Sequence, residues 1–214
     1  MNGVTINGKH SLDDFGLYLQ PKSIPVPEPK TNYVSIQGAN GQIDLSTALT
    51  DGNILYENRE IELSFACIGY GDVFNAKIER FMHNVHGKIV NLVFDDDSEH
   101  YFTGRCSVTD RDYQNGYCII TCEINADPFR YDVEVTKITK TVSETATLNI
   151  TNARKWVVPT ITASAEMTLY YQGVMYQIPE GTRINSNIVL RDGVNVLSFT
   201  GTGNLIIEYR QGVL

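Results

Sequence analysis

Basic side chains are scarce in this chain of 214 residues: 17 lysines and arginines stand against 25 aspartates and glutamates, and the formal net charge is -8. Nucleic-acid-binding surfaces neutralise phosphates with lysine and arginine, so this deficit argues against a DNA-binding module. No stretch approaches the roughly 18 apolar residues of a membrane-spanning helix. The N-terminal segment lacks the basic flank and apolar run of a secretory signal peptide. We therefore expect a soluble protein that is made in a cytosol and has no membrane partner.

The usual catalytic motifs are also missing from the sequence. It contains no G-x-S-x-G nucleophile motif, no P-loop and no complete dinucleotide-binding fingerprint. A cell-wall hydrolase would need two carboxylates with separated pKa values, and no pair stands out among the 25 acidic residues. We predict neither an enzyme nor a bound cofactor.

Cysteine is limited to four residues, and all four fall on the apolar phase of strand-like segments: Cys67, Cys106, Cys118 and Cys122. Cys118 and Cys122 would lie about 13 Å apart along a strand, and the close cysteine pairs of zinc sites are missing. Free cysteine packs as a small hydrophobic side chain. We therefore predict four reduced core residues.

Two groups of polar residues invite a metal-site interpretation. Glu79, His83 and His86 share one face of a predicted helix, but a solvated face has the same composition and the H-E-x-x-H arrangement is absent. The run 95–99 lacks the spaced ligands and the turn glycine of an EF-hand loop, and a hairpin tip accounts for its composition. No metal site is predicted.

The first part of the chain contains several strand patterns. Apolar and polar residues alternate in 61–67, 101–108 and 117–124, which predicts three half-buried strands. A short apolar run predicts a further strand at 89–94, and the turn residues at 95–98 would join it to its neighbour as a hairpin.

One helix is predicted between the first two of these strands. Asp72 is its expected N-cap and Gly87 its stop, and its apolar face consists of Phe74, Ile78, Phe81 and Val85. Closely spaced prolines at 20–30 exclude a helix or a central strand and predict an extended arm or edge segment.

A change in charge marks a boundary between two predicted domains, 1–131 and 132–214. The first carries 10 basic and 18 acidic side chains, whereas the second carries seven of each. The second domain reads as strands throughout, with turns at 172–173, 192–193 and 201–203. A small sandwich is predicted, with strands at 133–139, 145–150, 156–163, 167–171, 174–178, 188–190, 194–199 and 205–209.

Six segments of the first part stand in a distinctive order: NGKHSLDDFGLYL at 7–19, SIPVPEP at 23–29, YVSIQGANGQIDLSTAL at 33–49, YENREIELSF at 56–65, KIERFMHNVHGK at 77–88 and NADPFRY at 125–131. In this order they resemble the N-terminal domain of siphophage distal tail proteins (Dit). Residues 193–214 are similar to the end of that family's second domain, while 132–180 match only in their β pattern.

The resemblance implies a mainly β fold with one helix, in which an N-terminal β-sandwich of tail-tube type precedes a small galectin-like β-sandwich. It also implies a structural virion protein at the distal tip of a phage or prophage tail, assembled in the cytoplasm of the bacterial host. Six copies would form a ring and hub for host adsorption. The partners would be the tail tube protein, the tail-associated tip protein and a receptor-binding protein, with DNA only passing through the channel.

Two sets of residues are predicted to serve such a ring. Six first domains of charge -8 would bring -48 to the channel, where like charge keeps passing DNA unbound. Lumen-facing carboxylates are expected among Asp44, Asp51, Asp95, Asp96, Asp97, Glu99, Asp110 and Asp112. The ring interface is expected in the arm 24–29 and in a strand over 33–43, which has few charges to protect its edge. Its candidate residues are Ile24, Val26, Tyr33, Val34, Ile36 and Ile43.

A carbohydrate-binding adhesion module is the alternative prediction. It would require saturable glycan binding by residues 132–214 alone. That region contains no histidine, which galectin sugar sites use, and Trp156 is expected in a core or an interface rather than as a sugar platform.

Overall fold

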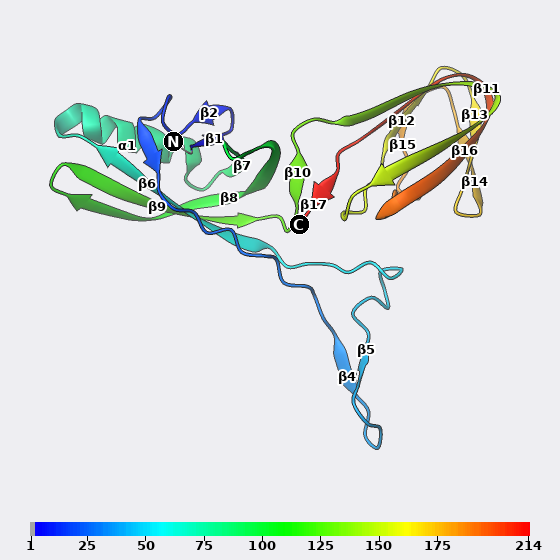
Figure 1. Cartoon of the computed structure of the whole chain (residues 1–214), viewed down its shortest axis with the longest axis horizontal. Helices are drawn as coiled ribbons and strands as arrows, with labels where there is room; N and C mark the ends of the chain where they lie inside the picture. Colours follow the sequence, from blue (N-terminus) through cyan, green and yellow to red (C-terminus); the bar gives the residue numbers. More distant parts are fainter. Residues whose placement is uncertain (1–2) are drawn as a thin grey trace. The chain divides into compact units, whose positions relative to one another are not determined.

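The structure, a computed structural model, describes residues 3–214 and divides into two compact units (Figure 1). Unit 1 comprises the chain up to Arg130 together with Leu214, and unit 2 comprises Tyr131–Val213. Strands dominate both units, and the described residues contain a single α-helix. The prediction of a mainly β fold with one helix is confirmed.

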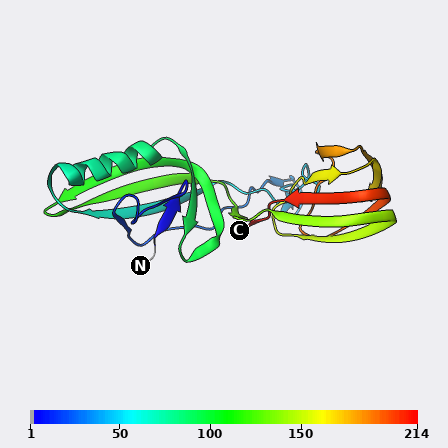
Figure 2. The same ribbon diagram turned by 90° about the horizontal axis from the view of Figure 1, so that it is seen from above.

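Unit 1 is built on an antiparallel sheet with the strand order β2-β1-β7-β8-β9-β6-β3. Helix α1 lies along one face of this sheet (Figure 2). The bounds of these elements are β1 Val4–Ile6, β2 Lys9–His10, β3 Leu17–Leu19, β6 Arg59–Ile68, α1 Gly71–Val85, β7 Ile89–Phe94, β8 Asp97–Gln114 and β9 Tyr117–Ala126.

The core of unit 1 follows the period-two pattern of its strands. Strands β6 and β9 pair over ten positions, and alternate residues of each turn toward the helix. The helix buries four apolar side chains against them, Phe74, Ile78, Phe81 and Val85. All four cysteines are free and buried, so the prediction of reduced core cysteines is confirmed.

The helix begins earlier than predicted. Its N-cap is Tyr70, and Asp72 lies in the first turn, where a carboxylate interacts favourably with the helix dipole. Gly69 and Gly71 adopt positive φ and turn the chain from β6 directly into the helix, so the prediction of Asp72 as N-cap is wrong. Gly87, with φ +73°, follows the C-cap and ends the helix as expected.

The segment at 33–43 is a hairpin rather than the predicted continuous strand. Strand β4 (Tyr33–Ser35) pairs with β5 (Gln42–Asp44), with Val34 opposite Ile43. Gly38 and Gly41 have φ of +87° and +77° and reverse the chain between the two strands. The hairpin extends away from the sheet of unit 1 (Figure 1).

Unit 2 contains a curled sheet with the strand order β14-β13-β16-β12-β15, and β11 pairs with β16 along its whole length. Two short strands, β10 (Arg130–Asp132) and β17 (Gly212–Val213), pair with each other. The remaining bounds are β11 Thr136–Asn152, β12 Thr160–Ala163, β13 Met167–Tyr171, β14 Val174–Ile178, β15 Gly181–Ile184 and β16 Gly193–Tyr209.

The predicted turn at 201–203 is wrong, because β16 runs through it and pairs with β11 over seventeen positions. Gly201 and Gly203 have φ of +143° and +150°, and Glu144, which pairs with Gly201, has φ +68°. A side chain at Gly201 would approach Met167 and the Glu166 carbonyl. The glycines therefore bend a continuous strand around its neighbours, and the predicted break between 139 and 145 in β11 is wrong for the same reason.

Of the predicted strand at 156–163 only Thr160–Ala163 forms a strand (β12), the predicted strand at 188–190 is largely irregular, and β15 was not predicted. Side-chain hydrogen bonds from two buried asparagines fix these segments, where a strand would use backbone hydrogen bonds. The Asn152 side-chain amide donates to the carbonyls of Lys155 (2.8 Å) and Leu190 (3.2 Å). Asn195 donates to the Arg191 carbonyl (2.8 Å) and accepts from the Arg191 amide (2.8 Å). Trp156 is half-buried, with the Arg191 guanidinium 4.8 Å from its ring centre.

Substitution of Gly104 by alanine tests the packing of unit 1. Gly104 in β8 lies opposite Ala126, and an added Cβ would come within 2.4 Å of the Asn125 carbonyl oxygen. We expect Gly104→Ala to lower the free energy of unfolding by about 2 kcal/mol, since the obstacle is backbone. Urea unfolding followed by circular dichroism measures this change. Ser107→Ala, at an exposed position of the same strand, is the control. Equal free energies of unfolding for the two variants would contradict the close approach of β8 and β9 at Gly104.

Candidate functional site

The segment between Val26 and Leu55 concentrates exposed apolar side chains. Outside this segment, large exposed hydrophobic residues are scattered over the two units. Within it they follow one another closely: Val26, Tyr33, Val34, Ile36, Ile43, Leu45, Leu49, Ile54 and Leu55. We call this segment, which includes the β4–β5 hairpin, the apolar arm.

The apolar arm carries little charge. Its charged residues are Glu28, Lys30, Asp44 and Asp51. Strands β4 and β5 pair only with each other within the described sheets, so each has an edge without a neighbouring strand. Exposed strand edges that lack protecting charges pair readily with other chains, and a contiguous apolar surface is typical of an interaction site.

The stem of the arm is fixed to the body of unit 1. Ser23 and Glu62 exchange two backbone hydrogen bonds of 3.0 Å. Farther along, the Lys30 amide donates to the Leu55 carbonyl at 2.8 Å, and the Glu57 amide donates to the Glu28 carbonyl at 2.8 Å. The arm therefore leaves the body on a paired stem.

The six residues predicted for a ring interface divide into two groups. Ile24 is half-buried and packs against the core of unit 1. Val26, at 81% exposure, and the four hairpin residues present their side chains to solvent: Tyr33, Val34, Ile36 and Ile43. The sequence analysis missed four further exposed residues of the arm: Leu45, Leu49, Ile54 and Leu55. The signal that could have found them is a group of apolar residues that follows neither a helical nor a strand period and lies among turn residues.

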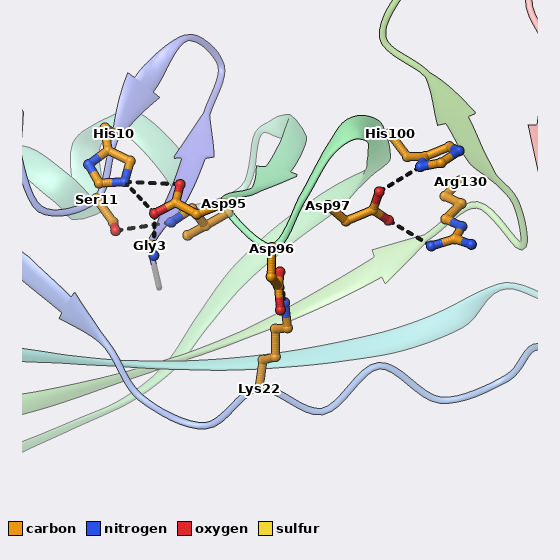
Figure 3. A network of polar contacts seen from close by, with 10 residues as sticks. Gly3, His10, Ser11, Lys22, Asp95, Asp96, Asp97, His100 and Arg130 are labelled. Atoms are coloured by element: carbon orange, nitrogen blue, oxygen red, sulfur yellow. Dashed lines mark hydrogen bonds and ion pairs between the residues drawn. The ribbon is translucent and has the colours of Figure 1, made fainter. Parts of the chain in front are cut away.

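The acidic turn between β7 and β8 is a hub of ion pairs (Figure 3). Asp95 accepts a hydrogen bond from the Gly3 amide at 2.6 Å and lies 3.3 Å from His10 Nε2. Asp96 pairs with Lys22 Nζ at 2.5 Å. These two aspartates thus bind partners on different segments of unit 1.

Asp97 has the most constrained carboxylate of the three. One of its oxygens lies 2.6 Å from His100 Nδ1, and the other accepts from Arg130 at 2.6 Å. Burial tends to raise the pKa of Asp97, but His100 and Arg130 outweigh it and hold this pKa below its ordinary value. Glu99, which was also predicted to face the lumen, is exposed.

The predicted hairpin is confirmed, because β7 and β8 pair antiparallel with Phe94 opposite Asp97. The carboxylates of its turn join it to other segments of unit 1 through ion pairs. No group of three or more histidine, cysteine, aspartate or glutamate side chains lies close enough to hold a metal ion within residues 3–214. His86, which was considered with Glu79 and His83, accepts a hydrogen bond from the Val108 amide at 3.0 Å. Helix α1, the single helix within residues 3–214, is not long and apolar enough to cross a membrane.

Replacement of Asp97 by asparagine tests the anchoring role. Because its pKa is lowered in the folded chain, the charged carboxylate stabilises the fold above the unfolded pKa near 4, and this stabilisation is lost as the pH falls through the folded value. We expect Asp97→Asn to lower the free energy of unfolding by about 1–2 kcal/mol at pH 7. The deficit should shrink below about pH 4. Glu99→Gln is the control, and a pH-independent deficit would contradict the ion pairs.

Comparison with known proteins gives one kind of match. No protein-family model and no curated protein sequence matches the chain. Among solved structures, the chain is similar to the SPP1 Dit (gp 19.1) protein, with a TM-score of 0.74, 17% sequence identity and coverage of 100% of both chains. That protein is described as a paradigm of the hub adsorption apparatus of phages that infect Gram-positive bacteria. The chain thus has a Dit-like distal tail protein fold over its full length.

Proposed function

We propose that this protein is a structural component of a phage tail hub that assembles with copies of itself into a ring. The observation that carries the proposal is the full-length fold similarity to SPP1 Dit, a hub adsorption protein. The apolar arm supports it independently, since its nine exposed apolar side chains form no core within the chain. Burial of such a surface between subunits is the usual driving force of obligate assemblies.

In this proposal the arm supplies the contact between neighbouring subunits. Strands β4 and β5 offer unprotected edges, and Val34 with Ile43 forms an exposed apolar pair across them. The paired stem gives the arm a defined direction, which a closed ring requires. Obligate interfaces bury more than about 2,000 Å², and an arm of this length can contribute to an area of that order.

The ring would be a hexamer at the distal end of the tail, between the tail tube and the tip protein, and it would be assembled in the bacterial host. It would act as a scaffold without catalysis or cofactor. A receptor-binding protein could attach to it, with unit 2 as the galectin-like domain that projects from the ring.

The channel of such a ring would need carboxylates that are free of cation partners. Asp95, Asp96 and Asp97 each lie against a cationic or histidine side chain, which reduces their field. Glu99, Asp110 and Asp112 are exposed, and no ion pair within residues 3–214 involves them. We therefore expect these three residues to contribute more to the proposed repulsion of DNA than the ion-paired aspartates.

Removal of the arm tests the proposed assembly. Because Lys30 and Leu55 are hydrogen-bonded neighbours, a two-glycine link can replace residues 31–54 without breaking the stem. We expect the variant to remain a folded monomer at concentrations where the unmodified chain forms a large species. Sedimentation velocity measures the mass of both.

A milder variant controls for the deletion. Val34→Asn combined with Ile43→Asn keeps the hairpin and replaces one exposed apolar pair, and it should weaken assembly at least tenfold. Gln37→Ser in the exposed loop is the matched control and should assemble normally. Assembly that persists in the deletion variant would refute the role of the arm.

A further inference from the structure

Strand β14 forms one edge of the sheet of unit 2 (Figure 1). Its single strand partner within residues 3–214 is β13, and the two strands pair without a bulge. The strand contains no charged residue and no proline, and the charged residues nearest to it in the chain are Glu166 and Glu180. Soluble proteins usually protect an edge strand with a charge, a proline or a bulge. Strand β14 has none of these.

The other ends of the two large sheets do carry such protection. At the opposite end of the same sheet, β15 contains Arg183. In unit 1 the edge strand β2 consists of Lys9 and His10, and the edge strand β3 is followed by Pro21 and Lys22. Strand β14 is therefore the unprotected end among these four.

The backbone groups of Met175 and Gln177 point away from the sheet. Tyr171 and Val174 flank a two-residue turn at 172–173 in which both residues have positive φ. A turn of this kind makes its two flanking residues a hydrogen-bonded pair. Because bonded and non-bonded pairs alternate along an antiparallel ladder, Met175 and Gln177 direct their N–H and C=O groups to the free edge.

This pattern of donors and acceptors is complementary to itself. When two copies of β14 lie antiparallel about a two-fold axis at Tyr176, Met175 of each copy lies opposite Gln177 of the other. Each of these pairs exchanges two hydrogen bonds, so the contact satisfies every outward group of the two residues. In the same register Glu180 lies opposite Gln172, so no like charges meet across the edge.

The charge of unit 2 also favours a second copy as the occupant of this edge. Residues 132–214 carry seven basic and seven acidic side chains, whereas residues 1–131 carry 10 and 18. Two copies of unit 2 therefore approach each other without net repulsion, while two copies of unit 1 repel each other. Pairing also covers Met175, whose side chain is 73% exposed, and burial of an apolar side chain is favourable.

We propose that β14 is the site at which unit 2 of one copy pairs with unit 2 of a second copy. The two strands join their sheets into one antiparallel sheet, with the register centred on Tyr176. An edge of five residues buries less than the roughly 1,200 Å² of a stable interface, so the contact is reversible. It uses no residue of the apolar arm. Because it is two-fold, it joins chains that are not neighbours within one closed ring.

Cysteine trapping in the full chain tests this register. In the variant Tyr176→Cys the thiols of two copies lie opposite each other at the axis, within reach of a disulfide. We expect oxidised glutathione to convert this variant to a covalent dimer at least fivefold faster than Gln172→Cys, an exposed position away from the axis. Gel electrophoresis without reductant measures the dimer. The unmodified chain, whose four cysteines are buried, gives the background.

A second pair of positions keeps the test decisive if Tyr176→Cys does not fold. Met175→Cys combined with Gln177→Cys replaces two exposed residues that lie opposite each other in the same register, so it should be trapped as well. Trapping of neither variant above the rate of Gln172→Cys would overturn the proposal.

An added charge separates pairing at the edge from contact between sheet faces. In the trapping variant, Met175→Lys should slow dimer formation at least fivefold, since it protects the edge. Val196→Lys is the matched control, because it replaces an exposed apolar residue of β16, which is paired along its whole length with β11. An unchanged rate with Met175→Lys, or equal slowing by Val196→Lys, would contradict edge pairing.

The arm-deleted chain separates this contact from ring assembly. Trapping accumulates a transient contact, so it should persist at position 176 when residues 31–54 are replaced by two glycines, even where sedimentation shows a monomer. Persistent trapping supports the edge contact whether or not rings form. Loss of trapping together with the arm would show that the arm holds the copies together, and it would overturn the independent contact.

Discussion

The pairing of β6 with β9 is the interaction on which the rest of unit 1 depends. Ten consecutive residue pairs place alternate side chains on the face that the helix covers, and the core of the unit forms between them. Strand β6 also carries Glu62, which fixes the stem of the apolar arm, and begins at Arg59, which lies in the pocket beside the acidic turn. Loss of this ladder would therefore disturb the core, the arm and the pocket together.

The apolar arm, unlike the sheet, is not stabilised by a core of its own. Its stem is held by backbone hydrogen bonds to the body, but its hairpin exposes hydrophobic side chains that its own chain does not cover. A segment of this kind lowers the free energy of the molecule only when a partner buries it. The Dit-like fold and the exposed arm are both in keeping with the proposed assembly, in which the arm would supply the contact between subunits.

The sequence predicts those parts of the fold that depend on local periods. Alternation located β6, β8 and β9, a short apolar run located β7, and helical spacing located the buried face of α1. The sequence-based prediction was wrong where glycines with positive φ decide whether a strand continues or turns. The pair Gly201 and Gly203 resembles a hairpin turn but bends a continuous strand, whereas Gly38 and Gly41 sit in a segment that resembles a strand and reverse it. Only the neighbouring strands decide between these uses of glycine.

The candidate sites show the same limit. A run of three aspartates predicts a turn, but the partners of these residues lie far away in the chain, at Lys22 and Arg130. Nothing in the local sequence distinguishes Arg59 from an exposed arginine, since its burial depends on Phe102 and Pro128. The arm was partly predictable, because a shortage of charge among apolar residues is visible without tertiary structure.

Electron microscopy of the unmodified chain tests the central claim most directly. Our account predicts closed rings with a central channel, in which the β4–β5 hairpin of each subunit lies against the next subunit. Rings in which the hairpin contacts no neighbour, or a chain that remains monomeric at every concentration and in the presence of tail tube protein, would contradict it.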